Sequence, residues 1–200
     1  MISIYELKPG FQRLLQPLLQ LFIRYGISPN QITIATMLLS ILMGTLIFIF
    51  QGSALVLFFL PIFLLIRMGL NALDGMLAKK MNLQSKLGEY LNELCDVVSD
   101  TCIFLSFLAI EGVSPFAIIM ITVFSVISEM SGVIAVQIGA SRRFDGPMGK
   151  SDRAFVFGAI AICLACGLEP GLWLSIILWL CLFLIAITIV NRMIKALKEV

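Results

Sequence analysis

The feature of this sequence that most constrains its fold is a series of apolar runs, each near the length of a membrane-spanning helix. A helix needs roughly 17 to 25 mainly apolar residues to cross a bilayer. The chain is 60% hydrophobic and 13% charged, with a mean hydropathy of +1.05, well beyond soluble domains. We therefore predict an all-α integral membrane protein with six transmembrane helices, at about 31–50, 54–73, 90–110, 114–139, 154–168 and 172–191.

The segment before the first run predicts an amphipathic helix that lies on the membrane surface. We expect Pro17 to bend this helix and Gly26 to end it, while Ser28 and Pro29 supply the capping side chain and first-turn proline that begin the first span. The apolar face consists of Phe11, Leu14, Leu15, Leu18 and Phe22, with Gln12, Arg13, Gln16 and Gln20 between them.

This division predicts a juxtamembrane helix at 1–27 and one six-helix membrane domain at 28–200. We find no internal repeat and no linker long enough for a second domain. The five cysteines, including the pair Cys163 and Cys166, lie in apolar runs without histidine or polar neighbours. We interpret them as packing residues rather than as a metal or redox site.

Basic residues occupy every second connection between the runs, which predicts the orientation of the chain. Cytoplasmic loops carry an excess of Lys and Arg, so we expect both termini to be cytoplasmic, in a bacterial inner membrane. The net charge of +2 is too small to indicate a nucleic-acid partner. Apart from Arg67, the basic residues form four groups: Lys8, Arg13 and Arg24; Lys79, Lys80 and Lys86; Arg142, Arg143, Lys150 and Arg153; Arg192, Lys195 and Lys198.

Two stripes of polar residues lie within or next to the second and third runs. A charge near the bilayer centre costs about 2.5–3.5 kcal/mol, so such residues usually face a bundle interior or a wet cavity. We expect the stripes to face each other; the alternative is local pairing, for example of Arg67 with Asp74. We also expect Glu129 to pair with Arg67. The stripes are Arg67, Asn71, Asp74 and Ala78, and Glu89, Glu93, Asp96 and Asp100 with Asn92 alongside.

Several carboxylates at the cytoplasmic end of the membrane domain predict phosphoryl chemistry on a charged headgroup. Their oxygens suit a hard cation, which in turn holds a phosphate or pyrophosphate. Gly75 and Gly88 lack side chains and let a phosphate approach the helix backbone closely. The neighbouring basic loops are expected to hold the remaining phosphate oxygens.

The segment from 71 to 96 resembles the CDP-alcohol phosphotransferase family. The family pattern is D-x-x-D-G-x-x-A-R, eight residues, then G-x-x-x-D-x-x-x-D, and this chain reads N-A-L-D-G-M-L-A-K, eight residues, then G-E-Y-L-N-E-L-C-D. The resemblance implies transfer of a phosphatidyl group from CDP-diacylglycerol, or of a phospho-alcohol from another CDP-alcohol, with release of CMP. The acceptor is an alcohol or phospho-alcohol, and a homodimer is expected.

The resemblance also assigns roles to residues of this chain. Asp96 occupies the position of the general base. The metal positions, for one or two Mg²⁺ or Mn²⁺ ions, are Asn71, Asp74, Asn92 and Asp96. The positions that hold the cytidine nucleotide or its phosphates are Asn30, Gln31, Ile32, Thr33, Gly75, Ala78, Lys79, Ser85 and Gly88.

The chain departs from the pattern where Asn71 and Asn92 replace aspartates and Lys79 replaces an arginine. Three readings stay open: one ion held by Asp74 and Asp96, extra charge from Glu93 or Glu89 as an auxiliary acid, or a catalytically degenerate CDP-lipid-binding partner of another lipid enzyme. We favour an active enzyme.

The segment Gly149–Arg153 opens the fifth run and predicts an anion clamp for the acceptor. Its residues are Lys150 and Arg153, with Arg142 and Arg143 nearby. The alternative is ordinary cytoplasmic charge, with Ser151 as a helix cap.

Overall fold

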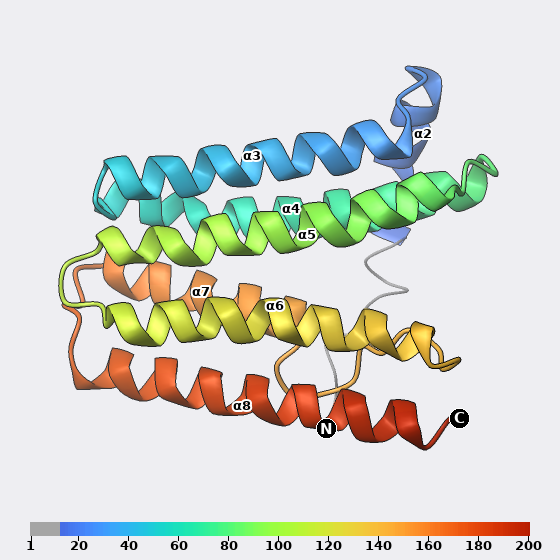
Figure 1. Ribbon diagram of the computed structural model, residues 1–200. Helices are drawn as coiled ribbons and strands as arrows, with labels where there is room; N and C mark the ends of the chain where they lie inside the picture. The colour runs from blue at the N-terminus through green and yellow to red at the C-terminus, as the bar shows by residue number, and fades with distance from the viewer. Residues whose placement is uncertain (1–12) are drawn as a thin grey trace.

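The computed structural model describes residues 13–200, and within them the protein is all helical (Figure 1). Residues before Arg13, including Phe11 and Gln12 of the expected amphipathic face, lie outside the described part. The elements are α2 (Gln16–Arg24), α3 (Pro29–Ile49), α4 (Ala54–Lys80), α5 (Lys86–Ser106), the 3-10 turn η2 (Phe107–Ala109), α6 (Pro115–Gln137), α7 (Lys150–Ala165) and α8 (Leu172–Leu197).

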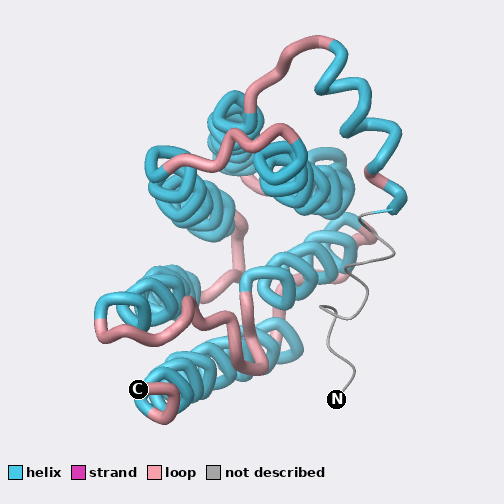
Figure 2. The backbone as a smooth tube through the Cα atoms, turned by 90° about the vertical axis from the view of Figure 1, so that its right-hand side faces the viewer, coloured by secondary structure: helices cyan, strands magenta, loops and turns pink. Residues whose placement is uncertain are grey.

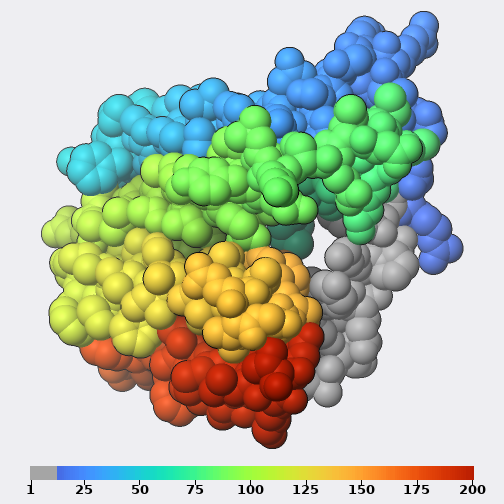
Figure 3. All heavy atoms as spheres, turned by 45° about the vertical axis from the view of Figure 1, so that its right-hand side comes forward, coloured from blue at the N-terminus to red at the C-terminus, as the bar shows by residue number. Residues whose placement is uncertain are grey.

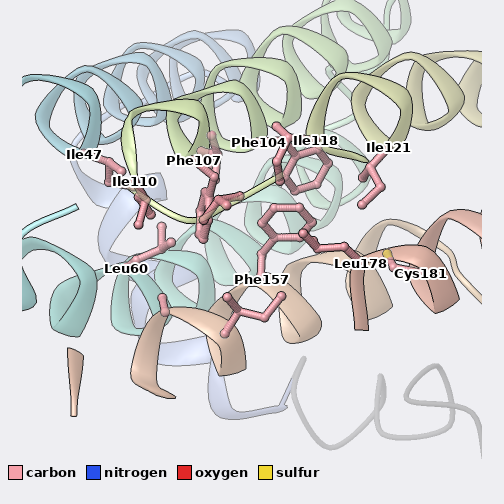
Figure 4. Packing of buried hydrophobic residues seen from close by; sticks show 14 of the residues in the cluster. Ile47, Leu60, Phe104, Phe107, Ile110, Ile118, Ile121, Phe157, Leu178 and Cys181 are labelled. Carbon is pink, nitrogen blue, oxygen red and sulfur yellow. The ribbon is translucent and has the colours of Figure 1, made fainter. Parts of the chain in front are cut away.

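The six long helices form one bundle, seen end-on in Figure 2. Within it α3 packs on α4 and α5, α4 on α7, and α6 on both α5 and α8. Three aromatic rings fill the middle, where Phe157 of α7 lies 4.3 Å from Phe104 and 5.0 Å from Phe107, centroid to centroid (Figure 4). These separations are favourable for offset and edge-to-face ring pairs, so α7 is anchored against the end of α5.

The helix boundaries match the six apolar runs, but four helices continue beyond them at the same end of the bundle. The second run was expected to end near residue 73, whereas α4 continues to Lys80. Helix α5 begins at Lys86, α7 begins at Lys150, and α8 continues to Leu197. The motif residues therefore stand on rigid helix at this end, which we call the motif end.

Four helices, α3, α4, α6 and α8, are long and apolar enough to cross a membrane. These helices make the chain an integral membrane protein. Helix α5 has the length, 21 residues, but carries the acidic stripe, and α7 has only 16 residues. The spans expected at α5 and α7, the third and fifth apolar runs, therefore remain predictions.

The capping signals before the first span are confirmed. Ser28 accepts a hydrogen bond from the Gln31 backbone N–H, the Gln31 side chain accepts one from the Ser28 N–H at 2.8 Å, and Pro29 is the first helical residue. Gly26 ends α2 as expected, with φ of +67°. Residues 13–14 are helical and Leu15 is a turn, so the helix is interrupted just before Pro17, which stands in the first turn of α2, where its missing N–H costs no helical bond.

Candidate active site

Helices α3, α4 and α5 bring the motif residues together at the motif end. The Thr33 hydroxyl donates a 2.8 Å hydrogen bond to Asp74 Oδ2, and the Asn71 amide donates one of 2.9 Å to Asp96 Oδ1. Deeper in the bundle, Arg67 pairs with Asp100 at 2.6 Å. The two polar stripes thus meet through Asn71 and Arg67, whereas Asp74 turns to α3.

Asp96 is the most heavily contacted carboxylate among the motif positions. Its Oδ1 accepts from Asn71, forms an ion pair with Lys150 Nζ, and lies 4.0 Å from Arg67 Nη2. Its Oδ2 makes no hydrogen bond or ion pair with the residues from 13 onward, and the side chain is 22% exposed. One oxygen is therefore held while the other remains available at the site.

A chain of ion pairs extends from Asp96 into the bundle. Its first and last residues are both on α5. From Asp96 it passes to Arg67, Asp100, Arg153, Glu129, Arg142 and Glu93. Arg192 also contacts Glu129, at 3.5 Å. Since a buried charge without a partner is costly, this alternation explains how so many ionised groups lie inside an apolar bundle.

Neither the pair expected between Glu129 and Arg67 nor the alternative pair of Arg67 with Asp74 forms. Arg67 contacts Asp100 and not Asp74, because Asp74 lies against Thr33 of α3. Glu129 contacts Arg153 at 3.0 Å and not Arg67, because α7 inserts its arginine between them. In the sequence, Arg192 was grouped only with the basic residues that orient the chain in the membrane. Its contact with Glu129 was therefore not predicted. The signal was an arginine one turn inside the last apolar helix.

The four basic residues expected at the acceptor side occupy different environments. Arg153 is fully buried, with 0% exposure, and its guanidinium contacts Asp100 and Glu129. The ammonium group of Lys150 forms an ion pair with Asp96 Oδ1. In the loop, Arg142 pairs with Glu93, and Arg143 pairs with Asp145 and Glu199 at 2.7 and 2.6 Å.

Ser151 is not the cap of α7. The cap residue is Gly149, whose N–H donates to Asp152 Oδ2 at 2.9 Å. A carboxylate three residues into the helix performs the function expected of the serine, and it fixes the backbone from which Lys150 projects.

The two auxiliary acids do not lie free beside Asp96. Glu93 is engaged by Arg142, and Glu89 is exposed, in the first turn of α5, without an ion pair among the described residues.

The expected nucleotide residues lie at the starts of α3 and α5 and on the last turns of α4. A carbon added at Gly75 would meet no atom within 4 Å, so the α4 backbone is open there. At Gly88 it would lie 3.1 Å from Asn30 Oδ1, which places the starts of α3 and α5 side by side. Ser85 caps α5 by accepting from the Gly88 N–H. Gln31 also acts as a cap, Ile32 is buried, Ala78 is half-buried and Lys79 is exposed.

The loop from 138 to 149 crosses close to α6. A carbon added at Gly132 would lie 2.6 Å from the Arg143 carbonyl oxygen, so only glycine lets the loop carry Arg142 toward Glu93. Figure 3 shows the surface hollowed between the atoms around 80–90 and this loop.

Hydrogen bonds stabilise the charged groups of the loop. Burial alone would raise the pKa of Asp145, but the bonds from Lys195 and Arg143 outweigh it and lower that pKa. The backbone N–H and hydroxyl of Ser141, with Arg143, lower the pKa of Glu199.

The donor set fits one hard divalent cation. Asp74 and Asp96 would provide carboxylate oxygens, and Asn71 and Asn92 amide oxygens, which are the ligand class of Mg²⁺ and Mn²⁺. Within 13–200 no three His, Cys, Asp or Glu side chains gather as a metal site, so amide oxygens have to complete the set.

The five cysteines are free, with Cys95 and Cys181 buried and Cys166 exposed.

Comparisons with known proteins show what this chain is similar to. Residues 26–190 match the model of the family described as CDP-alcohol phosphatidyltransferase. The chain is 36% identical to the inner membrane protein YnbA of Escherichia coli, over 96% of this chain and 94% of that protein.

Among solved structures, the fold is similar to the phosphatidylinositol phosphate synthase PgsA1 of Mycobacterium tuberculosis. The form with CDP-DAG bound has a TM-score of 0.78 at 22% identity, covering 94% of this chain and 95% of that chain. The form in complex with manganese and citrate has a TM-score of 0.76 at 21% identity, covering 92% and 88%.

Proposed function

Because the chain belongs to the CDP-alcohol phosphatidyltransferase family, we propose that it is a membrane transferase of phospholipid biosynthesis. It moves a phosphatidyl group from CDP-diacylglycerol to an alcohol or phospho-alcohol and releases CMP. The observation that carries this proposal is Asp96, held through Oδ1 beside the motif residues of α4, with Oδ2 left for chemistry.

The bond changes follow from this arrangement. The acceptor oxygen forms a bond to the phosphorus that carries the diacylglycerol, the bond from that phosphorus to the CMP oxygen breaks, and the hydroxyl proton passes to Asp96 Oδ2. Asn71 and Lys150 keep the carboxylate oriented through its other oxygen. When bound, a divalent ion would be held by Asp74 and the amide oxygens of Asn71 and Asn92, next to Asp96, and would supply charge stabilisation for the pyrophosphate and the departing CMP.

The donor and the acceptor approach from different parts of the motif end. Our candidate site for the nucleotide phosphates is the open α4 backbone at Gly75, together with Thr33 and Lys79. Arg142 and Arg143, on the loop across the hollow, are our candidates for an acceptor anion. Arg153 is not, because burial and two carboxylate contacts commit it to the interior.

We further propose six spans with the motif end and both termini in the cytoplasm of a bacterium. Basic groups at the ends of α4 and α8 and in the loop before α7 support this orientation. A reporter fused after Val200 tests it, since green fluorescent protein fluoresces and alkaline phosphatase stays inactive on the cytoplasmic side. A homodimer remains a prediction, to be checked by cross-linking in native membranes.

The transferase is tested by measuring CMP release from CDP-diacylglycerol by the purified full chain in detergent. Mg²⁺ or Mn²⁺ is titrated against a panel of alcohols and phospho-alcohols, with CDP-alcohols as alternative donors. We expect acceptor-dependent CMP that is lost with EDTA and in Asp96→Asn. The matched control is Glu169→Gln, which makes the same acid-to-amide change in the connection before α8, at the opposite end of the bundle.

Failure to release CMP from any donor, with CDP-lipid binding retained, would reject the enzyme and favour the non-catalytic binding relative. The family match and the relatives give no support to that alternative.

A further inference from the structure

The ion pair between Lys150 and Asp96 suggests how the site works with amides at two motif positions. We propose that the site holds a single divalent ion and that the ammonium group of Lys150 supplies, on Asp96 Oδ1, the positive charge that a second ion would otherwise provide. This inference rests on the proposed function, from which it takes the metal-holding residues.

The first argument is the donor chemistry of Asn71. A carboxylate oxygen has no proton to give, so the 2.9 Å contact requires the Asn71 amide to present its N–H to Asp96. The two side chains are therefore linked by a hydrogen bond, where two carboxylates at these positions would share a cation between them. An amide oxygen also carries no net charge, so Asn71 and Asn92 do little to offset a second ion.

The second argument is the occupancy of Asp96 Oδ1. Asn71, Lys150 and, at 4.0 Å, Arg67 already approach this one oxygen. A second divalent ion on the same oxygen would lie next to the Lys150 ammonium, and like charges at such distances repel strongly where water is scarce. Asp74 remains for one ion, and Asp96 Oδ2 stays available to accept the proton.

The third argument is charge balance. Asp74 and Asp96 contribute two negative charges, and Lys150 neutralises one of them. Arg67 belongs to the balance of Asp100, 2.6 Å away. With one divalent ion, the net charge of these groups is therefore positive, which suits a pyrophosphate. Two ions would leave a larger positive charge that these groups do not offset.

The backbone of Lys150 is fixed for this role. Next to it, the Gly149 N–H is capped by Asp152, and the Met148 N–H donates to the Thr188 hydroxyl of α8 at 2.9 Å. Three residues further on, Arg153 is held between two carboxylates. A lysine whose only role was to balance the charge of the loop would not need a backbone that is fixed both before and after it.

The test counts Mn²⁺ ions bound per chain by electron paramagnetic resonance of the full-length protein in detergent. We expect one ion in the wild type, and about tenfold tighter Mn²⁺ binding in Lys150→Gln, because a like charge leaves the site. The triple variant Asn71→Asp, Asn92→Asp, Lys150→Gln should bind two ions. Lys198→Gln is the matched control, since Lys198 is exposed and makes no ion pair among the described residues.

Two ions in the wild type, or unchanged affinity in Lys150→Gln, would overturn the inference. The count requires no turnover, so it separates this inference from the transferase proposal: one Lys150-sensitive ion without CMP release rejects only the latter. If CMP is released, Lys150→Gln should lower kcat at saturating Mn²⁺ and Lys150→Arg should retain most of it, and equal losses in both variants would also count against the charge role.

Discussion

Replacing Arg153 with methionine removes the central cation of the ion-pair chain while keeping much of the side-chain volume. Three contacts disappear: to Glu129 at 3.0 Å, to Asp100 at 3.3 Å and to the Met148 carbonyl at 3.3 Å. Breaking a buried pair by removing one partner costs about 3–5 kcal/mol. Asp100 keeps Arg67 and Glu129 keeps Arg192, so we expect the lower end, about 3 kcal/mol.

For a chain of this length, each kcal/mol shifts Tm by about 2–4 °C. We therefore expect a Tm roughly 6–12 °C below the wild type for Arg153→Met, measured by cysteine-reactive dye in detergent. The matched control is Arg143→Met, which removes two ion pairs at partly exposed positions. Such pairs contribute about 0–1 kcal/mol each, so we expect a smaller shift of Tm, of no more than about 4–8 °C for the two together. An unchanged Tm for Arg153→Met, with a raised acceptor KM, would refute the structural role and restore Arg153 as an acceptor clamp.

Three further predictions concern the loop, the motif end and pH. Gly132→Ala places a carbon 2.6 Å from the Arg143 carbonyl and should destabilise the protein by about 1–3 kcal/mol, seen as a lower Tm, whereas Gly158→Ala, 3.4 Å from Pro61, should be tolerated; equal Tm values would contradict the close approach. Thr33→Val removes the hydrogen bond to Asp74 and should lower kcat/KM about tenfold, the equivalent of roughly 1.5 kcal/mol, while Thr33→Ser retains it; full activity in the valine variant would mean that Asp74 needs no donor. Asp145 and Glu199 have lowered pKa values when folded, so their stabilisation is present above about pH 4 and is lost as the pH falls through the folded values. The Tm difference between wild type and Asp145→Asn should therefore shrink between pH 6 and pH 3, and a constant difference would contradict the assignment.

Sequence alone predicted the helices well because each apolar run is long and bounded by clear signals. Ser28 and Pro29 start α3, and Gly26 ends α2. The motif-end extensions were missed because hydropathy marks where a helix is apolar, not where its hydrogen bonding ends. Helix α4 continues through Asp74 to Lys80.

The candidate site was predicted in part. Helical spacing placed Arg67 and Asn71 on one face and Asp96 and Asp100 on another, and these four do meet. The α5 carboxylates that contact Lys150 and Arg153 were not predictable, because they lie more than fifty residues away in the chain. Such contacts depend on how α7 packs against α5, which no local pattern specifies.

The ion-pair chain that starts and ends on α5 also constrains how the protein is made. During synthesis, α5 and α6 emerge before α7, so Glu129 has no Arg153 partner when α6 is made, whereas Asp100 already has Arg67 of α4. An isolated charge costs about 2.5–3.5 kcal/mol at the bilayer centre. If α5 and α7 span the membrane as expected, biogenesis favours α6 and α7 entering the lipid together. A chain stopped after α6 should remain in contact with the insertion machinery until the arginine of α7 arrives.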